Sequence, residues 1–87
     1  MEEKKQVVYV VTELSLWEGA DNHNIWVRKD KGKAKELKRE LVELFLDDHN
    51  VDGYTVEDDD CSFECFKTNE GFSGNHYCVW VQSRVVL

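Results

Sequence analysis

The residues of this sequence best suited to chemistry lie in one acidic segment, 48–59. Asp48, Asn50 and Asp52 stand at alternate positions and are followed by Gly53. This arrangement matches the ligand spacing and the sharp turn of a calcium loop. The side-chain ligands of calcium or magnesium would be Asp48, Asn50, Asp52 and Asp59. A solvated acidic loop at a helix end is the competing interpretation. It is favoured because Asp59 is shorter than the usual closing glutamate, and because residues 61–66 suit a strand rather than a second helix.

A second group has the softer side chains that zinc prefers, and it consists of Cys61, Cys65, His76 and Cys78. On a strand Cys61 and Cys65 lie about 13 Å apart, so one ion could hold at most three of the four. No C-x-x-C knuckle is present. We therefore expect no cofactor, with zinc ranked below calcium and magnesium as the exception. Cys65 and Cys78 are then small buried side chains, or a cross-strand disulfide in an oxidising compartment.

Nucleophilic catalysis finds little support. Ser73 lies between glycines close to His76, but Asn75 stands where the G-x-S-x-G pattern needs its last glycine. No glycine-rich phosphate loop is present either. A small enzyme that uses Ser73, His76 and Cys78 is therefore the third functional hypothesis, behind a binding protein and a divalent-cation protein.

Charge is distributed unevenly along the chain. Residues 28–39 hold seven of the eleven Lys and Arg residues, whereas residues 40–70 hold eleven of the eighteen Asp and Glu residues. The longest acidic run is Glu57, Asp58, Asp59 and Asp60. Such runs are usually solvated surface, but this one could also bind a basic groove on a partner as a phosphate-like decoy, with an affinity that falls as salt rises. Trp17 is a candidate aromatic contact for the partner, and its alternative is to pack against the sheet.

The candidate sites depend on the elements that position them. Residue propensity and period predict strands over 6–16, 25–28, 62–67 and 76–86, and a helix over Lys33–Asp47 with Asp30 as its N-cap. The first strand is apolar on both faces, which suits a central position. The helix should bury Ala34, Leu37, Leu41, Leu44 and Phe45. If the last two strands pair symmetrically, Cys65 lies opposite Cys78 and Phe63 opposite Trp80, while Tyr77 and Val79 face the other way.

These elements predict an α+β fold in which one helix packs on a four-stranded, mainly antiparallel sheet in the order β-β-α-β-β. The chain has 87 residues, which makes residues 1–87 a single small domain. Its net charge of −7 argues against direct nucleic-acid binding and against anionic membranes. No apolar run is long enough to span a bilayer, and the charged start lacks the features of a secretion signal. Three cysteines fit a reducing compartment, so we expect a cytoplasmic protein.

Four segments carry a resemblance: VYVVTE from Val8, IWV from Ile25, KAKEL from Lys33 and NHYCVWV from Asn75. In these segments the chain is similar to small uncharacterised proteins of bacteria and their phages with a β-β-α-β-β pattern. The resemblance implies a stand-alone domain from a phage or mobile element, and it implies no activity and no site residues. We therefore expect a non-enzymatic protein that binds a protein partner through its charged surface, for example an anti-CRISPR-like inhibitor of a host protein.

Overall fold

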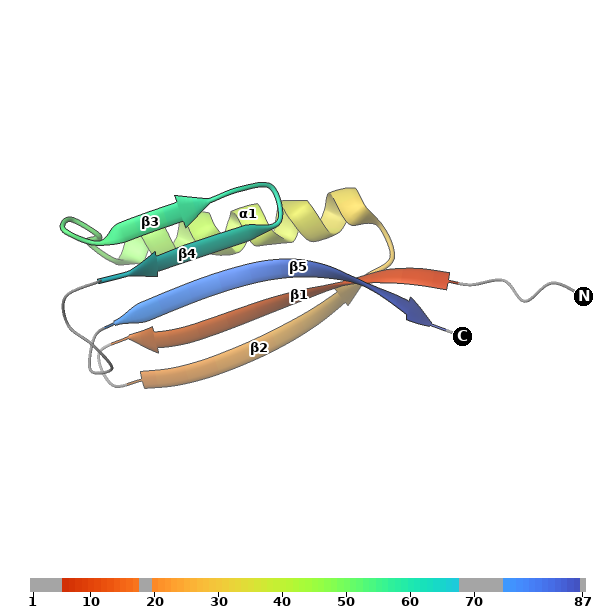
Figure 1. Ribbon diagram of the computed structural model, residues 1–87, viewed down its shortest axis with the longest axis horizontal. Coiled ribbons are helices and arrows are strands. Elements are labelled where there is room, and N and C mark those ends of the chain that lie inside the picture. The colour runs from red at the N-terminus through yellow and green to blue at the C-terminus, as the bar shows by residue number, and fades with distance from the viewer. Residues whose placement is uncertain (1–5, 18–19, 68–74, 87) are drawn as a thin grey trace, which may run out of the picture.

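One helix lies on one face of a five-stranded antiparallel sheet in a computed structural model of the chain, which describes residues 6–17, 20–67 and 75–86 (Figure 1). The elements are β1 (Gln6–Trp17), β2 (Ala20–Arg28), α1 (Lys31–Asp48), β3 (Thr55–Asp58), β4 (Ser62–Phe66) and β5 (His76–Val86). In space the strands follow the order β2-β1-β5-β4-β3. The predicted α+β class is confirmed, and β1 is an interior strand between β2 and β5, whereas the central strand is β5.

The prediction of four strands was wrong because it did not include β3. This strand has the sequence TVED, all four residues are exposed, and it pairs with β4 only, at the edge of the sheet. An edge strand with no buried face does not need apolar side chains. The acidic sequence of β3 is therefore hard to distinguish from that of a solvated loop.

The helix begins as expected, since the Asp30 carboxylate accepts a hydrogen bond from the Lys33 amide at 3.0 Å. Ala34 and Phe45 are buried as predicted, and Leu37 and Leu41 are partly buried against the core. Lys38 and Val42, which the predicted stripe did not include, are buried as well. Leu44 is 62% exposed, so its predicted place in the core was wrong. The helix is rotated about its axis so that the side chain of Lys38 faces β3. Within the described part of the chain α1 is the only helix, and it is not long and apolar enough to cross a membrane.

Aromatic rings form the centre of the core between α1 and the sheet. The Phe45 ring stacks on Tyr77 with 3.9 Å between centroids and meets the edge of Trp17 at 5.0 Å. Trp17 also stacks on Tyr54 at 4.9 Å and is only 7% exposed. Its proposed role as a partner contact is therefore corrected: Trp17 takes the alternative position, in the core.

The register of β4 and β5 differs from the prediction by one residue. Cys65 pairs with Tyr77, and Cys78 pairs with Glu64. A one-residue shift moves every side chain of a strand to the other face of the sheet. The observed register places the most apolar set toward the helix, namely Phe63, Cys65, Tyr77 and Val79, all buried. The symmetric pairing would have separated these four side chains, and burying them together therefore selects the register.

Candidate functional site

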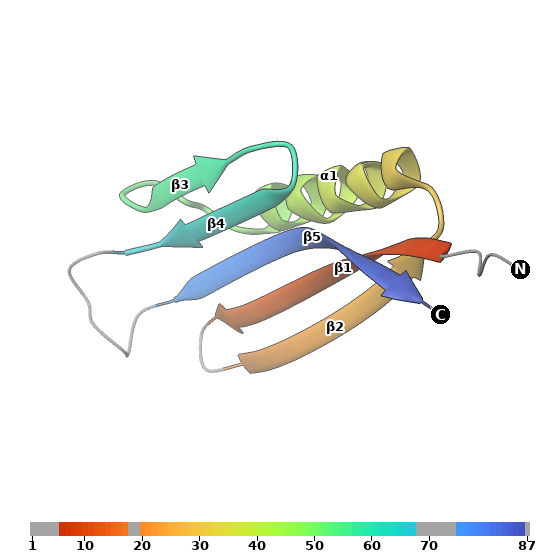
Figure 2. The ribbon, with the colours of Figure 1, turned by 45° about the vertical axis from the view of Figure 1, so that its right-hand side comes forward.

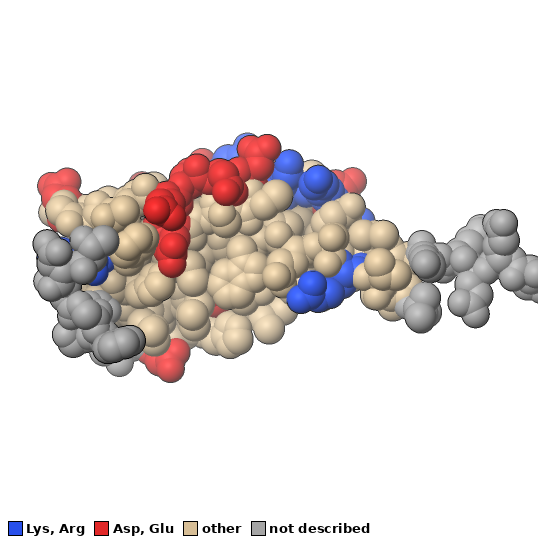
Figure 3. Space-filling view, in the orientation of Figure 1, with Lys and Arg blue, Asp and Glu red and all other residues tan. Residues whose placement is uncertain are grey.

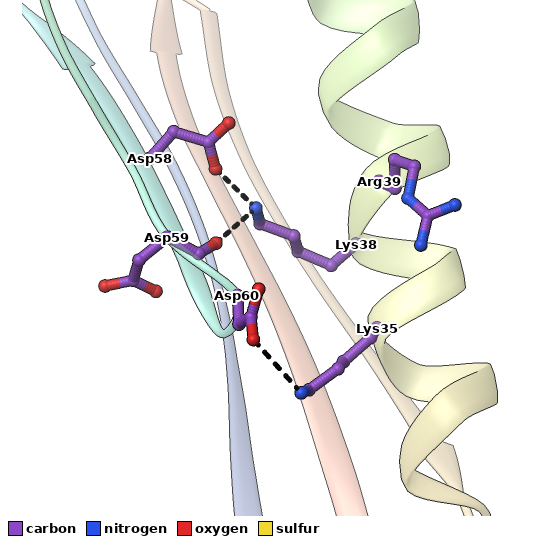
Figure 4. A pocket seen from close by; sticks show the side chains of 6 residues that line it. All are labelled: Lys35, Lys38, Arg39, Asp58, Asp59 and Asp60. Carbon is purple, nitrogen blue, oxygen red and sulfur yellow. Dashed lines mark hydrogen bonds and ion pairs between the residues drawn. The ribbon is translucent and has the colours of Figure 1, made fainter.

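Strand alternation divides the acidic run between the two faces of the sheet. Asp58 pairs with Phe63, so its side chain lies on the helix side, whereas Glu57 pairs with Glu64 on the opposite side. The Asp58 carboxylate accepts a hydrogen bond from the Lys38 ammonium at 2.6 Å, as Figure 4 shows. Asp60 forms a longer ion pair of 3.5 Å with Lys35. The basic and acidic segments of the sequence therefore neutralise each other in part, and the run is not one uniform array.

Lys38 is the cation at the centre of this contact. Lys38 does not belong to the apolar stripe predicted from the sequence, but its side chain is only 9% exposed. Its ammonium donates to the Asp58 carboxylate and to the Asp59 backbone carbonyl, the latter at 2.8 Å. A hollow of about 430 Å³ lies around these groups, lined by Lys35, Lys38, Arg39 and Asp58 to Asp60 (Figure 4). Most of the charged groups around this hollow are already paired with one another. Their contacts hold β3 against α1.

Asp59 shapes the turn between β3 and β4. One carboxylate oxygen accepts hydrogen bonds from the backbone amides of Cys61 and Ser62, both at 2.8 Å. The hydrogen bond from Cys61, followed by those from Ser62, lowers the pKa of the Asp59 carboxyl below its ordinary value of 3.8. Asp59 thus has a structural role in addition to its negative charge.

This lowered pKa predicts a pH dependence of stability. A carboxyl whose pKa is lower in the folded chain stabilises the fold above its unfolded pKa, and that stabilisation is lost as the pH falls through the folded pKa. The window therefore lies below about pH 4. Asp59→Asn keeps an acceptor oxygen but cannot titrate, so we expect wild type to lose more stability than D59N between pH 5 and pH 3 in urea unfolding. Parallel pH profiles of the two proteins would contradict this role.

The predicted calcium or magnesium ligands are spread from the end of α1 to the turn that follows β3. Asp48 ends α1, and the Asn50 side chain accepts a hydrogen bond from the Asp52 amide at 3.0 Å. Gly53 has a φ of 83°, which confirms the sharp turn. The extended residues of β3 then carry the chain about 13 Å away before Asp59 is reached. Among the described residues no three His, Cys, Asp or Glu side chains are grouped to hold a metal ion, so the cation hypothesis rests on the sequence pattern alone.

The cysteines are also separated. Because of the observed register, Cys65 lies on the helix side and Cys78 on the other face, so they cannot form a disulfide or join one zinc ion with His76. Burial raises the pKa of both thiols, and the carboxylate of Glu64 adds to the effect at Cys78. Raised values keep a thiol protonated, which is unsuited to nucleophilic or ligand chemistry. Ser73, from the enzyme hypothesis, lies outside the described residues.

The sheet face opposite α1, called the open face below, is the largest feature that the sequence did not reveal. No described element covers it, as Figures 1 and 2 show. The strand pairing places the same kind of side chain on it from three neighbouring strands: Val8, Val10, Leu14, Leu16, Ile25, Val27, Cys78 and Trp80. Ile25 is 59% exposed and Val27 is 55% exposed. Uncharged residues spread over this face in the space-filling view of Figure 3, with an arc of acidic residues on the β3–β4 side.

Several carboxylates meet this apolar surface along β3 and β4. Glu57, Asp59 and Glu64, called the acidic border below, line a second hollow of about 430 Å³ together with Ser62, Cys78 and Trp80. Glu64 lies 2.8 Å from the His76 ring nitrogen, whereas the Glu57 carboxylate has no hydrogen bond or ion pair among the described residues. An aromatic side chain beside unpaired negative charge suits a long basic side chain, whose stem is apolar and whose end is cationic.

A signal for the open face was present in the sequence. The residues of β1 are apolar at both odd and even positions, and a half-exposed strand alternates instead. That pattern indicates a strand whose two faces are both suited to burial, yet the described part of the chain has one helix, which covers one of them. Comparison of the chain with protein-family models, curated proteins and solved structures finds no match.

Proposed function

We propose that this protein is a non-enzymatic interaction domain that binds a protein partner through the open face and its acidic border. The observation that supports the proposal is an apolar sheet face that no described element covers. Monomeric soluble proteins rarely expose a large contiguous apolar patch, and a patch with a polar rim is typical of an interaction site.

The hollow at Trp80 indicates the chemistry of the partner. An arginine or lysine could lay its aliphatic stem against Trp80 and place its charge beside Glu57 and Glu64. A neighbouring apolar side chain of the partner would then cover Leu14 or Cys78. The complementary partner is a basic segment with interspersed apolar residues, held by charge at the border and by burial on the face.

The inhibitor form of this function, such as an anti-CRISPR-like decoy, uses fewer carboxylates than the sequence suggested. Asp58 and Asp60 already pair with lysines of α1, which leaves Glu57, Asp59 and Glu64 to meet a basic groove. Reversing the charge of Asp58 would also break its contact with Lys38. A binding test therefore needs substitutions on the open side of β3 and β4 alone.

The test compares two charge reversals of equal size. E57K/E64K changes the acidic border, and E40K/E43K changes two exposed positions of α1. With tagged protein as bait, we expect E57K/E64K to lose at least about 90% of the partner captured from lysate, because like charge now repels the partner's cations. E40K/E43K should capture it normally, and raising salt from about 0.1 to 0.5 M should weaken capture by wild type.

Trp80→Ala tests the apolar part of the same surface. We expect it to reduce capture about tenfold or more, as truncation of a central aromatic side chain commonly does, while circular dichroism verifies the fold. Equal capture by wild type, W80A and E57K/E64K would overturn the proposed function.

A further inference from the structure

The two edges of the sheet differ in how well they are protected. Among the described residues the outer side of β2 has no neighbour over nine residues, and it forms the lower border of the sheet in Figure 1. At the other edge β3 has four residues, two of them acidic. Proteins protect free edges with short strands, charges, lysines and prolines, because an unpaired edge is a template for another strand. β2 is long and contains neither lysine nor proline.

The charged and apolar residues of β2 follow an order that complements itself. Its first half is polar and begins with Asp21, whereas its second half contains Ile25 and Val27 and continues into the cations Arg28 and Lys29. When two such strands pair antiparallel, the acidic end of each meets the basic end of the other. The side chains of Asp21 and Lys29 form no ion pair or hydrogen bond among the described residues, so both are free for this contact.

We propose that two copies of this chain join edge to edge through β2, antiparallel, about a two-fold axis at Ile25. In this register Ile25 faces Ile25 of the second copy, His23 faces Val27, and Asp21 faces Lys29. Asp21, His23, Ile25 and Val27 lie on the open side of the sheet, and Lys29 directly follows the end of β2. The result is one ten-stranded sheet with both helices on the same side.

Alternative registers lose one of these matches. A shift by one residue places open-side positions opposite helix-side positions. A shift by two in one direction puts Asp21 opposite Val27. In the other direction it puts Asp21 opposite Lys31, which lies inside α1 and two residues further from the end of β2 than Lys29. The register centred on Ile25 is thus the one that keeps the strand pairing, the apolar contact and the ion pair.

The dimer also explains the exposure of Ile25 and Val27, which at 59% and 55% are among the most exposed apolar residues of the sheet. Pairing gives each of them a cross-strand neighbour. A single edge-to-edge contact is small, so we expect a dissociation constant on the order of micromolar. The two open faces become continuous, which would give the assembly two equivalent binding surfaces.

The test measures the monomer–dimer equilibrium of the full chain by sedimentation equilibrium over about 1 µM to 1 mM. We expect D21K alone and K29D alone each to raise the dissociation constant about tenfold, because the two-fold axis repeats each unfavourable pair. D21K/K29D exchanges the two charges and should restore the wild-type value. I25K should abolish the dimer, and E57K, at the opposite edge, should leave it unchanged.

Amide hydrogen exchange supplies a second readout. Backbone amides of 21–29 should become more protected as protein concentration rises, while those of β3 stay constant. A monomer at every concentration, or a dimer whose affinity is unaffected by D21K and I25K, would overturn the proposal. The dimer does not depend on the proposed function: K29D that still captures the partner at a concentration where it is monomeric would separate the two, as would a dimer that captures nothing.

Discussion

Phe45→Ala is expected to cost about 3–5 kcal/mol of unfolding free energy, a large part of what a domain of this size has. Phe45 is 5% exposed, and its ring contacts Tyr77 at 3.9 Å, His49 at 4.7 Å and Trp17 at 5.0 Å. Removing it leaves a cavity between α1 and the sheet that these rings cannot all close. Urea unfolding followed by tryptophan fluorescence measures the loss, and Phe45→Leu provides a milder variant if the alanine protein does not fold.

Leu44→Ala is the matched control, since Leu44 is the preceding residue of the same helix and is 62% exposed. Its substitution should change stability by no more than about 0.5 kcal/mol. The helical period predicted both residues to be core, so the pair tests which way the helix is turned. Equal losses from Phe45→Ala and Leu44→Ala would contradict the packing described above.

The second large effect is expected at the contact between α1 and β3. Asp58→Ala removes the acceptor at 2.6 Å from the Lys38 ammonium, whose side chain is only 9% exposed. Because a largely buried cation then loses its counter-charge, we expect a loss of about 2–3 kcal/mol. Asp60→Ala should cost no more than about 0.5 kcal/mol, because its pair with Lys35 is exposed.

Lys38→Met distinguishes a lost charge pair from a lost acidic residue. Methionine keeps the buried stem and needs no counter-charge, so we expect it to cost less than about 1 kcal/mol and to reduce the effect of a subsequent Asp58→Ala. Thermal or urea unfolding of the two single variants and the double variant measures this coupling. Additive losses in the double variant would show that Lys38 and Asp58 do not act as a pair.

Local sequence patterns predicted the local structure well. The N-cap at Asp30, the approximate span of α1, the turn at Gly53 and the strands β1, β4 and β5 follow from residue types and their spacing. Each depends on neighbours within a few residues, which is the range over which propensity and period act. For β2 only residues 25–28 were predicted, although the strand begins at Ala20. The edge strand β3 was missed because its exposed acidic residues have no apolar pattern to detect.

Long-range contacts could not be predicted in the same way. A symmetric hairpin and one shifted by a residue use the same turn formers, and the choice between them depends on the four side chains that reach the core together. The pairing of Lys38 with Asp58 likewise joins residues that are 20 positions apart. The acidic run was therefore predicted as an uninterrupted surface, although strand alternation and two lysines divide it.

The central claim is that the open face, rather than the helix, contacts the partner. Site-specific photo-crosslinking tests it with two matched positions: Leu16 on the open face and Leu44 on α1, which are 43% and 62% exposed. A benzophenone amino acid at either site leaves the core unchanged and reaches only what lies within a side chain's length. We predict that the partner captured by wild type is crosslinked from position 16 and not from position 44. Crosslinking from position 44 alone would contradict the proposed surface and place the contact on the helix.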